Sequence, residues 1–417
     1  MENTGASIKK NMLFNTVGSL IYYACQWFMS VVIVRISGYG DAGILSIAMS
    51  ITASPAIIGL FNIRSYQVSD INHTFSDRTY LRSRTYTNIL SFVICVIMTL
   101  ANGYTMEKVA AILIFMFYKL SEGYADVFYG IEQKRGRLDI AGISLAIRGV
   151  GALALFVLVF LAGGGMVPAI TAMTIYSFGV VILMDYRVTK KWNRDDVREQ
   201  KRATFSEIKD LLITCLPLAV VAFLNNLSIN IPKIYLEGYF GSEVMGYYSS
   251  VASPTVVIQL AATTVFAPLV PVLTRQYQEG KRKEFLQTLY RFAGLVVVLS
   301  AICLVGCKLL GRWALVLLFR ESIDPYVYLF IPIVWVSIFI AINACMFSIC
   351  TLLRIIKWQY LIGVVGVLTS WLLSITLVKS QSMMGVVYAL VGTLIAQTLI
   401  QVIMVIGKIK RMGKDNE

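Results

Sequence analysis

Long apolar runs, separated by short polar connections, follow one another along the whole chain. Twelve of these runs are long enough to cross a lipid bilayer, since a helix of about 20 residues spans the hydrocarbon core. They lie near residues 12–36, 41–63, 86–103, 107–130, 140–162, 166–186, 210–232, 243–268, 286–307, 325–352, 360–378 and 383–406. The pattern predicts an all-α integral membrane protein with twelve transmembrane helices.

The composition supports this interpretation. Of the 417 residues, 57% are hydrophobic and 14% are charged, whereas soluble proteins have about 25% charged residues. The formal net charge is +14, but the basic residues form short clusters between the apolar runs. We therefore interpret them as signals of membrane topology, and nucleic acid is not an expected partner.

The basic clusters fall on alternate connections. They lie at 9–10, 64–84, 134–137, 187–209, 275–283, 354–357 and 408–414, and the connections between them are poor in Lys and Arg, with 308–320 as a partial exception. Because cytoplasmic loops carry an excess of Lys and Arg, both termini are predicted to face the cytoplasm.

The most hydrophilic segment, RVTKKWNRDDVREQKR at 187–202, follows the sixth run and divides the chain into halves of six runs each. Many secondary transporters consist of two such repeated halves. We expect an N-terminal lobe at 1–186, a basic cytoplasmic linker at 187–209 and a C-terminal lobe at 210–417. The two six-helix lobes would surround a central cavity.

Three ionisable residues lie inside the run 107–130: Lys119, Glu122 and Asp126. Their spacing places them within roughly 60° of one another on a helix. A charge at the bilayer centre costs about 2.5–3.5 kcal/mol on insertion scales, so such residues usually face a partner or a wet cavity. Arg148, roughly 12 Å deep in the next run, approaches the depth of Glu122.

Two interpretations of this group remain open. Lys119 and Glu122 could pair within the helix and Arg148 and Asp126 between helices, and both pairs would only hold the lobe together. Alternatively, the group forms a cavity wall whose cations attract an anionic substrate. In that case the carboxylates of Glu122 and Asp126 either neutralise the cations or bind a coupling proton or sodium ion.

The seventh run carries a second polar stripe, formed by Asn226, Asn230, Lys233 and Glu237. These residues lie within about 40° on a helix and point to the same cavity. Hydrogen bonding between packed helices is the alternative role for the asparagines. For Lys233 the alternative is an extended side chain that reaches the headgroups.

The first run, which corresponds to the seventh, has its own polar stripe and ends near Arg35. The planar fork of arginine suits a phosphate group, because it can donate two hydrogen bonds to it. Basic residues of both halves could thus surround a diphosphate, and Arg64 could capture it at the cytoplasmic entrance. The predicted substrate-binding residues are Arg35, Arg64, Lys119, Arg148, Asn226, Asn230 and Lys233.

Several other functions are excluded. The chain has no GxxxxGK[ST] motif for ATP hydrolysis, and no loop is large enough for a catalytic domain. With seven cysteines in or beside apolar runs, no CxxC motif and a single histidine, His73 in a polar loop, no metal site is expected. We predict no catalytic residue, no cofactor and no enzymatic activity.

The segments 15–51 (NTVGSLIYYACQWFMSVVIVRISGYGDAGILSIAMSI), 129–149 (YGIEQKRGRLDIAGISLAIRG) and 228–250 (SINIPKIYLEGYFGSEVMGYYSS) carry a family resemblance. They resemble the polysaccharide-type flippases of the multidrug/oligosaccharidyl-lipid/polysaccharide exporter superfamily, which serve O-antigen, capsular or exopolysaccharide synthesis. The resemblance covers essentially the whole chain. Many relatives have arginine at the position of Lys233, so the phosphate contact there could differ.

The resemblance implies a protein of the bacterial cytoplasmic membrane with two six-helix bundles around a cationic cavity. It would move an undecaprenyl-diphosphate-linked oligosaccharide to the outer leaflet by alternating access, driven by a proton or sodium gradient. Membrane lipids, and a glycan polymerase or assembly proteins, are further expected partners.

The main alternative is an ion-coupled multidrug or cation antiporter of the same fold. That function would need an acidic cavity, whereas the three intramembrane cations Lys119, Arg148 and Lys233 outnumber the two carboxylates. The sign of the charge favours an anionic substrate.

Overall fold

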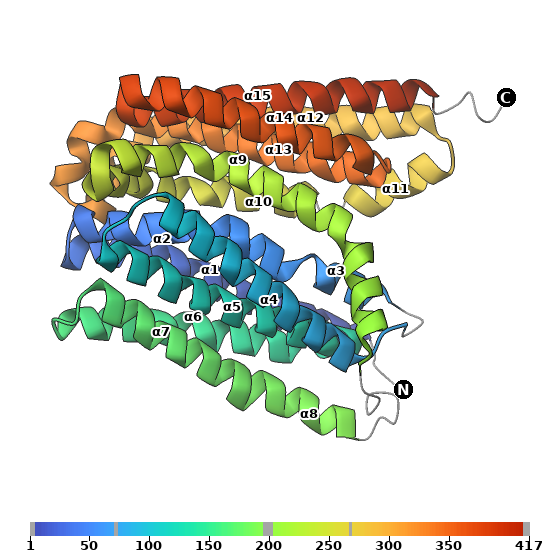
Figure 1. Cartoon of the computed structure of the whole chain (residues 1–417). Coiled ribbons are helices and arrows are strands. Elements are labelled where there is room, and N and C mark those ends of the chain that lie inside the picture. The colour runs from blue at the N-terminus through green and yellow to red at the C-terminus, as the bar shows by residue number, and fades with distance from the viewer. Residues whose placement is uncertain (1–4, 71–73, 195–202, 267–268, 412–417) are drawn as a thin grey trace. The chain divides into compact units, whose positions relative to one another are not determined.

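The computed structural model describes residues 5–70, 74–194, 203–266 and 269–411, and every regular element in these ranges is a helix. The predicted linker 187–209 lies partly outside the described residues. His73 also lies outside them. The chain divides into two compact units, Met1–Phe223 and Leu224–Glu417. In each unit the long helices run roughly side by side (Figure 1).

The first unit contains six long helical segments and several short ones. Its elements are α1 (Gly5–Ile36), α2 (Tyr39–Leu60), α3 (Ile63–Ser69), α4 (Asp77–Ala101), α5 (Met106–Lys134), α6 (Leu138–Leu161), α7 (Met166–Val180), the π-helix η1 (Val181–Tyr186), α8 (Arg187–Arg194) and the first part of α9 (Phe205–Ala252).

The second unit begins inside α9. Its further elements are η3 (Ser253–Thr255), α10 (Val256–Phe266), α11 (Leu269–Gln278), α12 (Arg282–Phe319), η4 (Glu321–Leu329), α13 (Phe330–Leu352), α14 (Ile356–Leu373), the π-helix η5 (Ser374–Val378) and α15 (Lys379–Arg411). Because the two units meet within one helix, the predicted lobe boundaries at 187–209 stay a prediction.

Nine helical segments of the described residues are long and apolar enough to cross a membrane. Two of them have 55 and 54 residues, far more than the 17–25 or so that one crossing needs. They contain interruptions at Gly241 (φ 82°) and Ser382 (φ 50°). α5 is long enough as well, but its charged residues keep it out of the nine. The all-α membrane fold is confirmed, and the count of twelve stays a prediction.

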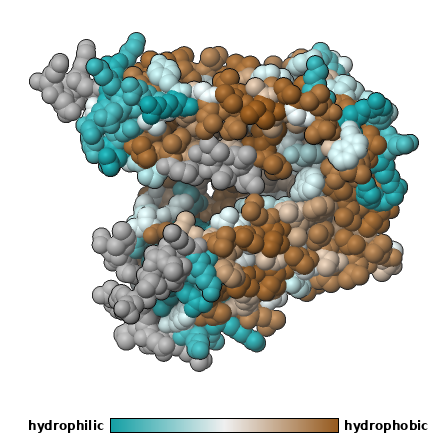
Figure 2. All heavy atoms as spheres, turned by 180° about the vertical axis from the view of Figure 1, so that it is seen from behind, coloured by the Kyte–Doolittle hydropathy of each residue, from teal (hydrophilic) through white to brown (hydrophobic). Residues whose placement is uncertain are grey.

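The lateral surface of the units is apolar. Hydrophobic side chains cover broad areas of the face shown in Figure 2, and hydrophilic ones gather toward the helix ends. On α12, for example, Leu309 and Trp313 are 75% and 67% exposed. Exposing so much apolar surface to water would cost free energy, whereas exposing it to lipid would not. The chain is a multi-pass membrane protein.

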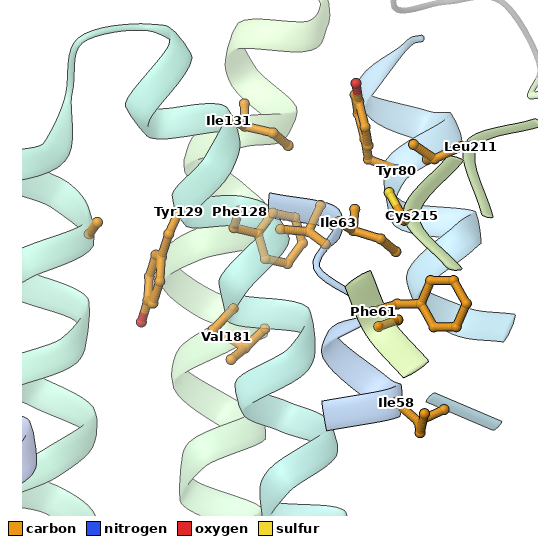
Figure 3. Close-up of a cluster of buried hydrophobic side chains, with 14 residues drawn as sticks. Ile58, Phe61, Ile63, Tyr80, Phe128, Tyr129, Ile131, Val181, Leu211 and Cys215 are labelled. Carbon is orange, nitrogen blue, oxygen red and sulfur yellow. The ribbon is translucent and has the colours of Figure 1, made fainter. Parts of the chain in front are cut away.

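A buried apolar cluster in the first unit fixes the position of α3. Phe61 (φ 48°) and Asn62 (φ 54°) adopt the left-handed conformation, which turns the chain sharply between α2 and α3. Ile63 then packs beside Phe128 of α5 in the cluster shown in Figure 3. This turn brings Arg64, the next residue of α3, against α5.

Candidate functional site

Lys119 and Glu122 form an ion pair on the surface of α5. The Nζ atom of Lys119 lies 3.1 and 3.0 Å from the two carboxylate oxygens of Glu122. The side chains are 20% and 24% exposed. The intrahelical pair that the spacing allowed is therefore present.

The polar stripe of α1 contacts this pair. The hydroxyl of Tyr22 donates a hydrogen bond to Glu122 and lies 3.0 Å from the hydroxyl of Tyr118. Gln26 donates to the Tyr22 hydroxyl at 3.1 Å. These hydrogen bonds join α1 to α5 and hold the carboxylate of Glu122 in place.

Asp126 pairs with two arginines, neither of which is Arg148. Its Oδ2 atom lies 2.8 Å from Nη2 of Arg84 on α4, and its Oδ1 atom lies 3.4 Å from Nη1 of Arg64 on α3. The Arg148–Asp126 pair, one of the alternatives left open by the sequence, is therefore not formed. Arg84 also donates to the carbonyl of Gly59 and is completely buried.

Arg84 is not among the predicted site residues, because it precedes the third apolar run at 86–103. The helix begins nine residues earlier, at Asp77, where the hydroxyl of Ser76 accepts a hydrogen bond from the backbone of Thr79. This N-cap signal, Ser76 followed by an aspartate, was available in the sequence.

Arg148 lies among neutral side chains and is only 1% exposed. Its guanidinium donates to Ser177 on α7 at 2.9 and 3.1 Å, to Ser121 at 3.3 Å and to the Tyr129 hydroxyl at 3.4 Å. It also lies 5.8 Å from the centroid of the Tyr22 ring. Arg148 thus contacts α5 at Ser121, next to Glu122, but it presents no surface to a substrate in this conformation.

Arg64 is the most exposed basic side chain of this group, at 31%. Besides Asp126, it contacts Gln133 at 3.1 Å and lies 5.8 Å from the ring centroid of Tyr129. The sequence predicts Arg64 at the cytoplasmic entrance, just after the second span. In the structure its side chain lies over α5. Its guanidinium therefore belongs to the same group of charges as Asp126.

Arg35 lies apart from this group. It is exposed in the last turn of α1, about 20 Å along the helix from Tyr22 at 1.5 Å per residue.

In the second unit, Asn226, Asn230 and Lys233 form a connected stripe on α9. The amide of Asn230 donates to the backbone and side-chain oxygens of Asn226 at 2.9 and 3.0 Å, and Lys233 reaches the Asn230 oxygen at 3.5 Å. Among the described residues, no carboxylate lies within ion-pair distance of Lys233. The predicted common cavity involves both units and stays a prediction.

Two buried carboxyl groups of the first unit were not singled out from the sequence. Glu132 lies near the end of α5 and Asp185 lies in η1, and both are 0% exposed. The position of Asp185 within the apolar run 166–186 was the available signal.

Residues 8–277 match the model of a family described as polysaccharide biosynthesis protein. The chain belongs to this family. The match confirms the resemblance to the polysaccharide-type flippases. The capsular polysaccharide biosynthesis protein CapF of Staphylococcus aureus is 29% identical over 317 residues, which are 75% of this chain and 78% of CapF.

Solved transporters share the fold of this polysaccharide biosynthesis protein. An inward-facing multidrug resistance MATE family transporter of the MOP superfamily has a TM-score of 0.70 and 14% identity over 97% of this chain and 99% of its own. A MOP superfamily transporter from Pyrococcus furiosus, titled for the reverse polarity of its binding pocket, has a TM-score of 0.64 and 12% identity, with 99% and 96% covered. At such identities the likeness shows the fold alone. The fold is thus one that solved transporters share.

Proposed function

We propose that this polysaccharide biosynthesis transporter carries a lipid-linked oligosaccharide, anchored by undecaprenyl diphosphate, across the bacterial cytoplasmic membrane by alternating access. Both termini would face the cytoplasm, and an ion gradient would drive the movement. The glycan and the diphosphate would occupy the protein while the polyprenyl chain stays in lipid.

The observation that carries this proposal is the charge balance around α5. In the connected groups described above, four basic side chains stand against two carboxylates. The buried carboxyls of Glu132 and Asp185 lower this excess of positive charge by one if they hold one proton between them, and the balance stays positive. An anionic diphosphate would compensate this excess inside a low-dielectric environment. These residues are Arg64, Arg84, Lys119 and Arg148 with Glu122 and Asp126.

Burial divides the roles of the basic residues. Arg64 and Lys119 are partly exposed and can meet the phosphates directly. Arg84 and Arg148 are buried and would act as positioning residues through Asp126 and Tyr22.

The second unit also carries groups that could bind the substrate. Lys233 and its two asparagines offer a point charge and amide donors on one helix face. We propose that they contact the phosphate or the sugar. Arg35 would bind only at a later stage of transport, because it lies far along α1 from the other cations.

A cation antiporter is disfavoured by the same charge balance. An excess of positive charge repels a cationic drug unless the carboxylates are freed, and both Glu122 and Asp126 are held in ion pairs. MATE neighbours share the fold but, at 12–15% identity, do not indicate the substrate.

The direct test is reconstitution in liposomes with a fluorescent polyprenyl-diphosphate-linked oligosaccharide. Arg64→Ala and Lys119→Met should each abolish movement of the glycan. Arg312→Ala is a matched control, because Arg312 also pairs with an aspartate, Asp324, but is exposed outside this group. Transport of a cationic dye instead of the glycan by the unaltered protein would overturn the proposal.

A further inference from the structure

Glu132 and Asp185 are fully buried carboxyl groups. Both side chains are 0% exposed, and none of their four carboxyl oxygens accepts a hydrogen bond of regular geometry from any described residue. The Ser144 hydroxyl and the Arg148 guanidinium are the polar groups that act on Asp185. An ionised carboxylate at such a buried position loses the stabilisation of its hydrating water and gains no hydrogen bond of regular geometry in return. A bound proton or another cation must therefore provide this stabilisation.

The packing of α5 against α7 brings the two carboxyls toward each other. The two helices touch where the hydroxyls of Ser121 and Ser177 lie 2.7 Å apart. Nearer the start of both helices, Thr174 reaches the carbonyl of Ile114, so the helices run in the same direction. From the serine contact, Glu132 lies about 16 Å and Asp185 about 12 Å along their helices, a difference that two side chains can span.

The π-helix η1 directs Asp185 to this face. On a regular α-helix, residues eight positions apart are rotated by about 80°, so Asp185 would turn away from the face that carries Ser177. The π-turn at Val181–Tyr186 inserts one extra residue and reverses most of this rotation. Such π-turns are frequent at functional sites.

Two ring contacts hold the two helical segments together near the carboxyls. The rings of Phe128 and Tyr186 have centroids 6.2 Å apart, and the guanidinium of Arg135 lies 5.6 Å from the ring centroid of Trp192. Glu132 lies between Phe128 and Arg135 in α5, one helical turn from each. The two contacts therefore flank Glu132, and Asp185 lies beside the first of them because it directly precedes Tyr186.

The charged groups that act on the pair have other partners. Arg64 is bound to Asp126 and Gln133, Arg137 is bound to Asp139, and Arg148 is bound to hydroxyls. Lys134 lies over the ring of Tyr80. No described cation forms an ion pair with either carboxyl, so repulsion between two carboxylates would be compensated only in part, by basic groups at longer range. The charged groups facing the pair are Arg64 of α3, Arg137 before α6, and Asp139 and Arg148 of α6.

We propose that Glu132 and Asp185 bind one proton between them and form the proton-coupling site of this transporter. One carboxyl holds the proton on an oxygen and donates it to an oxygen of the other, which is ionised. Loss of the proton to water leaves two carboxylates, and their repulsion loosens the contact between α5 and η1. Only the coupling role rests on the proposed function; the shared proton does not.

Glu122 and Asp126, the carboxylates predicted from the sequence for ion coupling, are less suited to this role. Each is held by a basic side chain at 2.8–3.1 Å. The basic partner stabilises the ionised carboxylate, and protonation would remove this stabilisation.

Infrared spectroscopy of the full chain in lipid nanodiscs tests the shared proton without any glycan. The unaltered protein should show a protonated-carboxyl band at neutral pH that shifts in D₂O. The double variant Glu132→Gln, Asp185→Asn should lose this band. In each single variant the remaining carboxyl no longer faces a second carboxylate, so the band should disappear at a pH at least about one unit lower than in the unaltered protein. Glu122→Gln is the control that should leave the band unchanged.

Three results would overturn the proposal: no such band at neutral pH, a band that survives in the double variant, or removal of the band by sodium at constant pH. The last result would make the pair a metal-cation site. The transport assay then tests coupling: Glu132→Gln should move the glycan in both directions without response to a pH gradient. A protein that shows the band but moves no glycan would refute the proposed function and leave the proton site standing.

Discussion

Arg84 of α4 and Asp126 of α5 form an ion pair with a distance of 2.8 Å between Nη2 and Oδ2, and the arginine is completely buried. This pair fixes α4 against α5 at the point where Arg64 also reaches the same carboxylate. It keeps Asp126 from acting as an independent ion site and orients it toward Arg64.

Neutralising this aspartate should strongly destabilise the first unit. Asp126→Asn leaves the Arg84 guanidinium buried without a counter-charge, which costs about 3–5 kcal/mol in comparable buried pairs. Thermal unfolding in detergent should show a clear drop in midpoint. The double variant Arg84→Met, Asp126→Leu should recover most of it, and a single variant as stable as the unaltered protein would contradict the role given to the pair.

Arg64 should respond differently, because it is partly exposed. Arg64→Ala should leave the unfolding midpoint nearly unchanged but weaken binding of the lipid-linked glycan about 10–100-fold, since a hydrogen bond to a charged group contributes about 1.5–3 kcal/mol. Arg64→Lys should retain part of the affinity. Equilibrium binding in nanodiscs measures both, and equal affinity in all three proteins would remove Arg64 from the substrate site.

Arg148→Lys is expected to be nearly as harmful as Arg148→Ala. The guanidinium serves Ser121, Ser177 and Tyr129 from three nitrogen atoms, and a single ammonium cannot reach all of them. Each polar group left unsatisfied in a buried site costs about 1–3 kcal/mol. The measurement is again thermal unfolding, with membrane insertion checked separately; full stability of the lysine variant would show that charge alone matters.

The contact between α1 and α6 depends on two glycines. A methyl group at Gly18 would meet the backbone of Gly142, and one at Gly142 would meet the backbone of Phe14. Small residues allow such close approach in membranes. Gly142→Ala should therefore destabilise the protein by about 1–3 kcal/mol, whereas Gly179→Ala, with open space around it, is the matched control.

Asp70, between α3 and α4, should give a pH-dependent contribution to stability. Burial alone would raise the pKa of its carboxyl, but hydrogen bonds from the backbone of Thr74 and Phe75 and from the Tyr80 hydroxyl outweigh burial and lower the pKa. The carboxylate therefore stabilises the fold above its unfolded-state pKa of about 3.9, and this stabilisation is lost as the pH falls through the lower folded-state value.

The measurement compares the unaltered protein with Asp70→Asn between pH 7 and pH 3. The difference in unfolding midpoint should be full at pH 7 and should shrink on acidification. A difference that stays constant over this range would show that the carboxylate charge is not involved.

The amino-acid sequence by itself determined the local features of this protein. Apolar runs of spanning length predicted the helices, and the three-residue spacing of Lys119 and Glu122 allowed the pair that the structure contains. The stripe at Asn226, Asn230 and Lys233 was equally accessible. In all these cases helical periodicity fixes which side chains are neighbours, and periodicity can be read from the sequence.

Only the tertiary structure decided the partners between helices. It pairs Asp126 with Arg64 and Arg84, encloses Arg148 among hydroxyls, and buries Glu132 near the π-turn that carries Asp185. Such contacts depend on the rotation, depth and order of packed helices, and a single extra residue in a π-turn redirects a side chain. These quantities arise from packing over long sequence separations, so the spacing of residues along the chain could not supply them.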